Sequence, residues 1–342
     1  MATAVAGRVA RVSAPAEIED TLAALWREAG RDRPLTRALM ANLVVFRACG
    51  AAEPIDLTAP IAGLPVDDVA ARHPSRVIVV HHARGHAAAA AKVEASVAII
   101  TAGTPDAPIG IEEIAVRSAC PDESLPSIVR RLALGDLPTS IWWTDDLSAD
   151  TPRAALVAMG RQLVYDSRGW RDLRVGIRTV VAMLDQARGP DLADLNWRRL
   201  APMRQALMQA ASPAYHGIPP RARHVRIYHR PGDGALAWLL AGWLASRLGW
   251  RTGALPLAVE EARHGGDQLS ISFGSETDVD VTATMNGHRV LVKSHNGAAP
   301  LIVSVPRRGE AEAVAAELQS LGRDESHHDA VAALAAIFAA AA

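Results

Sequence analysis

The chain of 342 residues contains only two cysteines, Cys49 and Cys120, and they lie far apart in the sequence. They form no CxxC pair, so the sequence offers neither a zinc ribbon nor a dithiol redox motif. Free, buried thiols in a reducing compartment are the expected state, and a regulatory disulfide between the two is the alternative.

Long hydrophobic runs are also scarce. Arg8 and Arg11 interrupt the first apolar stretch, and the most hydrophobic segment, 235–250, is too short to cross a bilayer. The formal net charge of −1 provides no basic surface for nucleic acid or for an anionic membrane. We therefore expect a cytoplasmic protein that binds neither nucleic acid nor membrane.

The motifs of common catalytic sites are absent as well. The sequence contains no G-x-S-x-G, S-x-x-K, H-E-x-x-H or P-loop pattern. Gly232–Ala237 matches G-x-G-x-x-A, but an Arg–Pro pair separates it from the preceding strand and no βαβ unit follows, so we interpret it as a loop before a helix. His81, His82 and His86 have no acidic or cysteine ligand near them in the sequence. We therefore predict no catalytic residue, metal or cofactor.

Tryptophan, by contrast, is abundant: the eight Trp outnumber the three Phe and three Tyr together. Trp142 and Trp143 end the predicted strand 139–143, and the carboxylates of Asp145 and Asp146 follow. Neighbouring side chains of a strand point to opposite faces, so the two indoles cannot fill the same layer. We expect one to pack inward and the other to lie against a helix or near the surface, where a large rigid ring suits a contact with a partner.

The first half of the chain alternates predicted helices and strands, which is typical of a mixed sheet covered by helices. The predicted helices are 16–29, 66–72, 123–134, 152–159 and 170–187, and the predicted strands are 42–47, 76–82, 93–101, 109–118, 139–143 and 161–166. The helix 66–72 should end at His73, because a residue before proline disfavours the helical conformation.

The second half changes pattern after Gly189–Pro190, the best boundary candidate. It is predicted to contain helices over 191–211 (bent at Pro202), 235–248, 310–321 and 328–338, and strands over 223–229, 269–273, 279–285, 289–294 and 301–305. Asn286–Gly287 is a strong hairpin signal. We predict a two-domain α/β protein, with an N-terminal mixed α/β domain over 1–188 with flanking helices and a C-terminal α+β domain over 189–342 with a largely antiparallel sheet.

Polar residues follow several strands of the first half, and parallel strands would bring them to one edge of the sheet. These candidates for a small-ligand edge are His82, Arg84, Asp166, Ser167 and Arg168. Small anions bind at the carboxyl ends of such strands, so one hypothesis is a sensor or enzyme for a sugar phosphate or a nucleotide. The alternative is that these side chains only cap the helices that follow.

Several segments, taken in order, resemble the glucose-6-phosphate dehydrogenase assembly protein family, OpcA. They are His73–Val80, Leu137–Trp143, Val164–Arg168, Asp194–Trp197 with Arg204, and Leu240–Arg247. The resemblance therefore extends over both predicted domains.

The resemblance implies a non-catalytic protein that binds glucose-6-phosphate dehydrogenase and promotes its active oligomer or raises its activity allosterically. Such a protein would support the oxidative pentose phosphate pathway and the supply of NADPH. Cyanobacterial relatives are linked to thioredoxin, but two distant cysteines argue against that control here. A scaffold without kinetic effect is a further alternative, and self-association is left open.

The candidate contact residues combine the resemblance with residue chemistry, because buried aromatic anchors and arginines dominate many interfaces. They are His73, Arg76, Trp143, Asp145, Trp197, Arg198 and Arg204. Among them, we expect the two tryptophans and the three arginines to be exposed. Core packing is the alternative for both tryptophans, since Trp143 ends a strand and Trp197 shares a predicted helix face with leucines.

Overall fold

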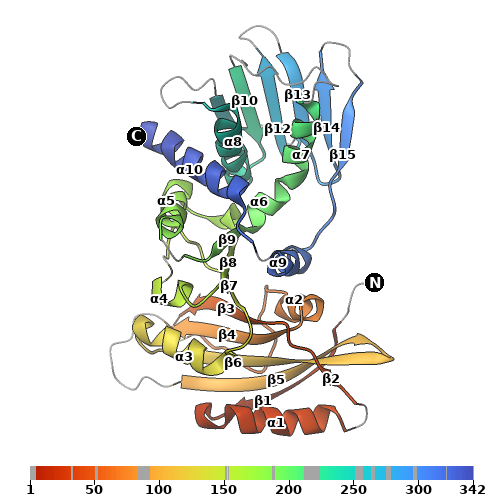
Figure 1. The fold of residues 1–342 in the computed structure, drawn as a ribbon, viewed down its shortest axis with the longest axis vertical. Coiled ribbons are helices and arrows are strands. Elements are labelled where there is room, and N and C mark those ends of the chain that lie inside the picture. The colour runs from red at the N-terminus through yellow and green to blue at the C-terminus, as the bar shows by residue number, and fades with distance from the viewer. Residues whose placement is uncertain are drawn as a thin grey trace.

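The computed structural model places two β-sheets at opposite ends of an elongated molecule (Figure 1). It describes residues 5–31, 34–50, 53–83, 93–150, 152, 154–186, 189–211, 224–250, 257–262, 266–274, 279–295, 299–320 and 322–341. The predicted α/β class, with a mixed sheet first and a largely antiparallel sheet second, is confirmed.

The first sheet, here the large sheet, has nine strands in the order β1-β5-β6-β4-β3-β7-β8-β9, with β2 beside β6. Its strands are β1 (Val5–Ser13), β2 (Thr36–Arg37), β3 (Ala41–Cys49), β4 (Ser75–Ala83), β5 (Val93–Thr104), β6 (Ala107–Ser118), β7 (Thr139–Trp143), β8 (Gln162–Tyr165) and β9 (Asp191–Asp194). The run from β6 to β9 is parallel throughout, whereas β5 pairs antiparallel with both β1 and β6. The expected hairpin of β5 and β6 is therefore confirmed.

The second sheet, the small sheet, has six strands in the order β11-β10-β12-β13-β14-β15. They are β10 (His224–His229), β11 (Leu257–Glu261), β12 (Leu269–Gly274), β13 (Val279–Met285), β14 (Arg289–Ser294) and β15 (Leu301–Ser304). Only the pair of β10 and β11 is parallel. The side chain of Asn286 accepts hydrogen bonds from the amides of His288 and Arg289, which closes the hairpin predicted between β13 and β14.

Helices cover both faces of the large sheet and tie it to the small one. They are α1 (Ile18–Ala29), α2 (Val66–Arg72), α3 (Leu125–Leu132), α4 (Ala154–Val157), α5 (Leu173–Leu184), α6 (Leu195–Arg199), α7 (Ala201–Ala210), α8 (Gly234–Leu248), α9 (Glu310–Gln319) and α10 (Glu325–Ala340). Leu22 of α1 and Val69 of α2 belong to separate apolar cores on opposite faces. Helix α10 packs between α8 and α5, and α9 packs on α2.

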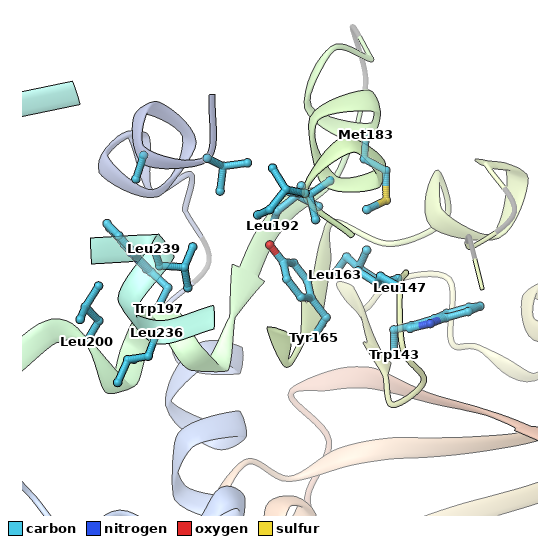
Figure 2. Close-up of a cluster of buried hydrophobic side chains, with 14 of the residues drawn as sticks. Trp143, Leu147, Leu163, Tyr165, Met183, Leu192, Trp197, Leu200, Leu236 and Leu239 are labelled. Atoms are coloured by element: carbon cyan, nitrogen blue, oxygen red, sulfur yellow. The ribbon is translucent and has the colours of Figure 1, made fainter. Parts of the chain in front are cut away.

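One apolar core runs without a break from the large sheet into the small one. Figure 2 shows Trp143, Tyr165 and Leu192, from β7, β8 and β9, followed by Trp197 of α6 and Leu236 of α8. Figure 1 shows β7, β8 and β9 in the middle of the molecule, between β3 and α6. The predicted boundary at residue 189 stays a prediction, and β9, which follows it, pairs with β8 of the large sheet.

The two adjacent tryptophans lie on opposite faces, as strand geometry requires. Trp143 joins the core of Figure 2, where its ring stacks on Phe46 with centroids 4.1 Å apart, whereas Trp142 packs with Val45 on the other face. Each is only 2% exposed, so the second indole packs against covering helices, as one of the two expectations for it stated, and does not lie near the surface. Helices cover both faces of the sheet at this point, which leaves neither indole free.

Several elements differ from the sequence prediction. Asp191–Asp194 forms β9 rather than the start of a helix, because these residues pair with β8. The strands β1, β2 and β11 were not predicted, since each lies at or near a sheet edge and is stabilised by pairing with a distant segment. The predicted break near Pro202 is confirmed: α6 ends at Arg199 and α7 begins two residues later.

Truncating Trp143 tests whether it is a core residue. Trp143→Ala should lower the free energy of unfolding by about 3–5 kcal/mol, because it removes a fully packed ring and leaves a cavity beside Phe46. Val12→Ala, at a side chain that is 71% exposed, is the control and should cost less than about 0.5 kcal/mol. Urea unfolding of both variants measures the difference, and a loss below about 1 kcal/mol for Trp143→Ala would contradict this placement.

Candidate functional site

Four of the seven candidate contact residues are buried. His73 is 6% exposed, Arg76 2%, Trp143 2% and Trp197 4%. The expectation that Arg76 is exposed is therefore wrong, and for both tryptophans the alternative of core packing is confirmed. Asp145, Arg198 and Arg204 keep partial exposure.

Arg76 on β4 belongs to a buried charge network between α1 and the large sheet. Its guanidinium donates to Glu19 of α1, and its Nε lies 3.7 Å from Glu112 on β6. Glu112 also accepts a hydrogen bond of 2.8 Å from the Trp26 indole and pairs with Arg37 at 2.8 Å. Buried charges persist only when such partners satisfy them. The network therefore positions α1 on the sheet.

Asp145 closes the loop after β7. Its Oδ2 accepts a hydrogen bond of 2.7 Å from the amide of Ala48, near the end of β3. Asp146 accepts from the amide and hydroxyl of Ser148, and from the amide of Arg171. Asp145 and Asp146, which follow the two tryptophans, thus accept hydrogen bonds from backbone amides.

Trp197 and Arg204 connect α6 and α7 to α10. The guanidinium of Arg204 lies 3.5 Å from the centre of the Trp197 ring, and the indole donates a hydrogen bond of 2.8 Å to Asp324. Asp324 also accepts from the amide of His327 and so caps α10. Burial lowers the pKa of Arg204 to about 10. Arg198, the third residue of this group, pairs with Glu317 on α9.

The predicted small-ligand edge is divided between two places. His82, at the end of β4, lies with Nε2 2.7 Å from Asp122. Asp166, after β8, pairs through both oxygens with Arg199, at 2.7 Å each. Two strands, β3 and β7, lie between β4 and β8, which puts the two groups about 14 Å apart. Arg84 lies outside the described residues.

Asp194 sits fully buried where β9 turns into α6. Its Oδ1 accepts hydrogen bonds from the amides of Ser167, at 3.1 Å, and Asn196, at 2.8 Å. Burial, together with the nearby charge of Asp166, raises the pKa of this carboxyl to about 7. The side chain of Asp194 therefore joins the loop after β8 to the start of α6. It caps a helix, as the alternative interpretation proposed for the edge candidates.

The glycine loop before α8 carries a buried carboxylate beside the first turn of the helix. Gly232 has φ +84°, and Asp233 follows at the N-cap position with only 2% exposure. Its carboxylate lies 2.9 Å from the guanidinium of Arg230 and 3.7 Å from that of Arg168. The Asp233 side chain accepts no hydrogen bond from the amides of α8, but its negative charge would repel a phosphate bound at this helix N-terminus. The loop is therefore not built as a dinucleotide site.

A cleft of about 440 Å³ opens between the two sheets, beside the end of β8. Four arginines line it, together with Glu310 at the start of α9: Arg168, Arg198, Arg199 and Arg308. Further lining residues are Ala201, Pro202, Gln205, Gln268, Met285, Ser304, Val305, Pro306, Gly309 and Ala313. Its volume falls within the range of about 300–1,000 Å³ that is usual for small-molecule sites. We take this arginine cleft as the candidate functional site.

The sequence indicated only two of these arginines, Arg168 and Arg198, and for different sites. The cleft is assembled from the loop after β8, from α6 and α7, and from segments beside β12, β13, β15 and α9. No local pattern joins elements so far apart in the chain. The pairs Arg198–Arg199 and Arg307–Arg308 were the available signals.

Metal ligands and thiols do not form a second site within the described ranges. No three His, Cys, Asp or Glu side chains of these ranges are grouped to hold a metal ion. Cys49 and Cys120 are free thiols, and burial raises the pKa of Cys49. In the described part of the chain, no helix has the length and apolar character needed to cross a membrane.

Comparison with known proteins gives two matching family models, both of OpcA. Residues 66–182 match the N-terminal domain of the glucose-6-phosphate dehydrogenase subunit family, and residues 190–331 match its C-terminal domain. Similar relatives include two named putative OxPP cycle protein OpcA. The one from Nostoc punctiforme is 27% identical over 225 residues, 65% of this chain and 47% of the relative. The one from Synechococcus elongatus is 28% identical over 170 residues, 48% of this chain and 36% of the relative. The matched regions thus span less than half of these relatives.

Two solved structures are distantly similar. The super-repressor mutant of Gal80p from Saccharomyces cerevisiae gives a TM-score of 0.42 at 9% identity, over 88% of this chain and 96% of that one. Apo scyllo-inositol dehydrogenase from Lactobacillus casei gives 0.41 at 11% identity, with the same coverage. At this level neither informs function.

The fold and the site define a two-sheet α/β protein with a continuous core and an arginine-lined cleft between the sheets. The matched models extend over most of both halves. The chain belongs to the OpcA family of glucose-6-phosphate dehydrogenase assembly proteins, so the resemblance found in the sequence is confirmed.

Replacing Arg76 tests the buried network. Arg76→Ala should destabilise the protein by about 3–5 kcal/mol, because Glu112 loses a partner inside the fold. Arg11→Ala breaks an exposed pair with Glu28 and should cost less than about 1 kcal/mol. Urea unfolding compares the two, and equal losses would show that the Arg76 network contributes no more than a surface pair.

Asp194 should make stability depend on pH. Because its pKa is raised in the folded state, the native protein binds the proton more tightly, and stability falls as pH rises from about 4 through about 7. Asp194→Asn keeps an oxygen for both amides and cannot ionise. Its stability relative to the wild type should rise by at least about 1.4 kcal/mol between about pH 5 and about pH 8, measured by urea unfolding.

Asp172→Asn is the control for this experiment. Asp172 caps α5 from an exposed position, where it accepts a hydrogen bond of 3.0 Å from the amide of Val175. Its difference from the wild type should stay constant over the same pH range. If the Asp194→Asn curve ran parallel to the wild-type curve as well, the ionisation of Asp194 would not be linked to folding.

Proposed function

We propose that this chain binds glucose-6-phosphate dehydrogenase and favours its active oligomer, without catalysing a reaction of its own. The observation that carries the proposal is the match of both OpcA domain models, over 66–182 and 190–331. The relatives named as OxPP cycle proteins support a role in the oxidative pentose phosphate pathway, and hence in NADPH supply, inside the cytoplasm.

An activator of this kind must bind the active form of the enzyme better than the inactive form, since equal affinity shifts no equilibrium. A tenfold shift requires a difference of about 1.4 kcal/mol, which one or two good contacts supply. The interface can therefore be modest in size, and neither partner needs to change fold.

The partly exposed candidates define the surface that we propose for this contact. Arg198 and Arg204 line a hollow of about 180 Å³ between α6, α7, α9 and the start of α10. Asp145 lies on the separate loop after β7. The buried candidates, His73, Arg76, Trp143 and Trp197, would act only by supporting the outer surface. We therefore place the docking surface over α6 and α9.

Mixing the purified chain with the dehydrogenase of the same organism tests the proposal. We expect the two proteins to co-elute on size exclusion with light scattering, and the rate of NADP⁺ reduction to rise several-fold as the chain is titrated. Absence of co-elution together with an unchanged rate would refute binding and activation alike. Co-elution without a rate change would favour the scaffold alternative instead.

A pair of matched variants tests the docking surface. Arg198→Gln should weaken binding to the dehydrogenase about three- to tenfold, because it removes a charge at the proposed contact. Arg178→Gln removes an exposed arginine of α5, away from this surface, and should bind as the wild type does. Equal affinities for the two variants would show that the contact lies elsewhere on the chain, without contradicting the binding itself.

A further inference from the structure

In the arginine cleft, carboxylates hold arginine side chains, whereas the contacts around it cap helices through backbone amides. Arg199 is held by Asp166 through two hydrogen bonds, and Arg168 lies 3.7 Å from the buried carboxylate of Asp233. A guanidinium fixed in this way is already oriented before a ligand arrives, so less side-chain entropy is lost on binding. The cleft thus has prearranged donors.

Four arginines and one carboxylate, that of Glu310, line the walls, although carboxylates outside the lining pair with three of the arginines. Arg308 is exposed and forms no ion pair with any residue in the described part of the chain, and Arg168 is half exposed. Arg198 and Arg199 add further guanidinium donors, although each also pairs with a carboxylate. Planar guanidiniums bind phosphate oxygens through paired hydrogen bonds, and more favourably than they bind neutral groups.

The uncharged side chains that line the cleft suit the rest of a phosphorylated ligand, such as a polyol or another polar group. Gln205 and Gln268 offer amide donors and acceptors, and Ser304 offers a hydroxyl. Met285 and Val305 add an apolar wall. This mixture of few charges, some amides and an apolar side is typical of sites for small organic ligands.

One group opposes an anion. The carboxylate of Glu310 lines the cleft, and burial, together with the charge of Asp166, raises its pKa above the ordinary value. Removing this carboxylate should therefore strengthen anion binding, whereas it would weaken the binding of a cation. Replacing Glu310 thus distinguishes a negatively charged ligand from a positively charged one.

We propose that the arginine cleft binds a small metabolite that carries a phosphate monoester, with Arg168 and Arg308 contacting the phosphate. The walls come from the end of β8 in the large sheet and from segments beside β12, β13 and β15 of the small sheet. A bound ligand would therefore contact both sheets at once. It would also lie next to Arg198, at the edge of the docking surface over α6 and α9. The binding of a phosphate ester does not rest on the proposed action on the dehydrogenase, and it can be tested without that enzyme.

Isothermal titration of the full chain provides the test. The probes are glucose 6-phosphate, adenosine 5′-monophosphate, inorganic phosphate and unphosphorylated glucose. We expect a phosphate ester to bind at least tenfold more tightly than inorganic phosphate, and glucose not to bind. The comparison of the two esters identifies the class of the attached group.

Three variants connect binding to the cleft. Arg308→Gln should weaken binding of the ester at least tenfold, and Glu310→Gln should strengthen it severalfold. The control is Arg307→Gln, which removes an exposed neighbouring charge whose guanidinium contacts His288 rather than the cleft. Its affinity should stay within twofold of the wild type.

Several results would overturn the proposal. No binding of any phosphate at millimolar concentration would show that the arginines serve another purpose, such as receiving an acidic segment of a protein partner. Equal losses for Arg307→Gln and Arg308→Gln would indicate only general charge attraction. Weaker binding by Glu310→Gln would contradict an anionic ligand at this site.

Discussion

The structure depends on the apolar core that continues from β7, β8 and β9 into α6 and α8. Its central members are Trp143, Tyr165, Leu192 and Trp197, all nearly excluded from solvent (Figure 2). Because these side chains pack on one another, the large sheet and the helices that carry the small sheet share their hydrophobic stabilisation. Trp143 and Trp197, which lie in the segments that resemble the family, are therefore packing residues of this core.

Carboxylates organise the polar connections around that core. Asp194 holds the loop after β8 against the start of α6, Asp166 holds Arg199, and Asp324 joins the Trp197 indole to α10. Asp194 and Asp324 satisfy buried donors that would otherwise lack a partner, which costs about 1–3 kcal/mol. The same contacts orient the arginines that face outward. Stabilisation of the junction and construction of the cleft are thus achieved by the same residues.

If both proposals hold, this arrangement gives a physical basis for linking metabolite binding to docking of the dehydrogenase. The arginine cleft is lined from both sheets, and the surface over α6 and α9 adjoins it through Arg198, which lines both hollows. A ligand that contacts two elements favours the arrangement in which it contacts both. Metabolite binding and docking of the dehydrogenase would then be coupled through the same short segment, 195–201.

The sequence by itself determined the elements with strong local signals. Helix 66–72 ends before Pro74 for a steric reason, strand 139–143 sends its tryptophans to opposite faces, and the family followed from ordered segments. Only the tertiary structure decided that Arg76 and Trp143 are buried, that 191–194 is a strand, and where the arginines of the cleft meet. Burial, strand pairing and clefts depend on partners distant in the chain, and local periodicity carries no information about those partners.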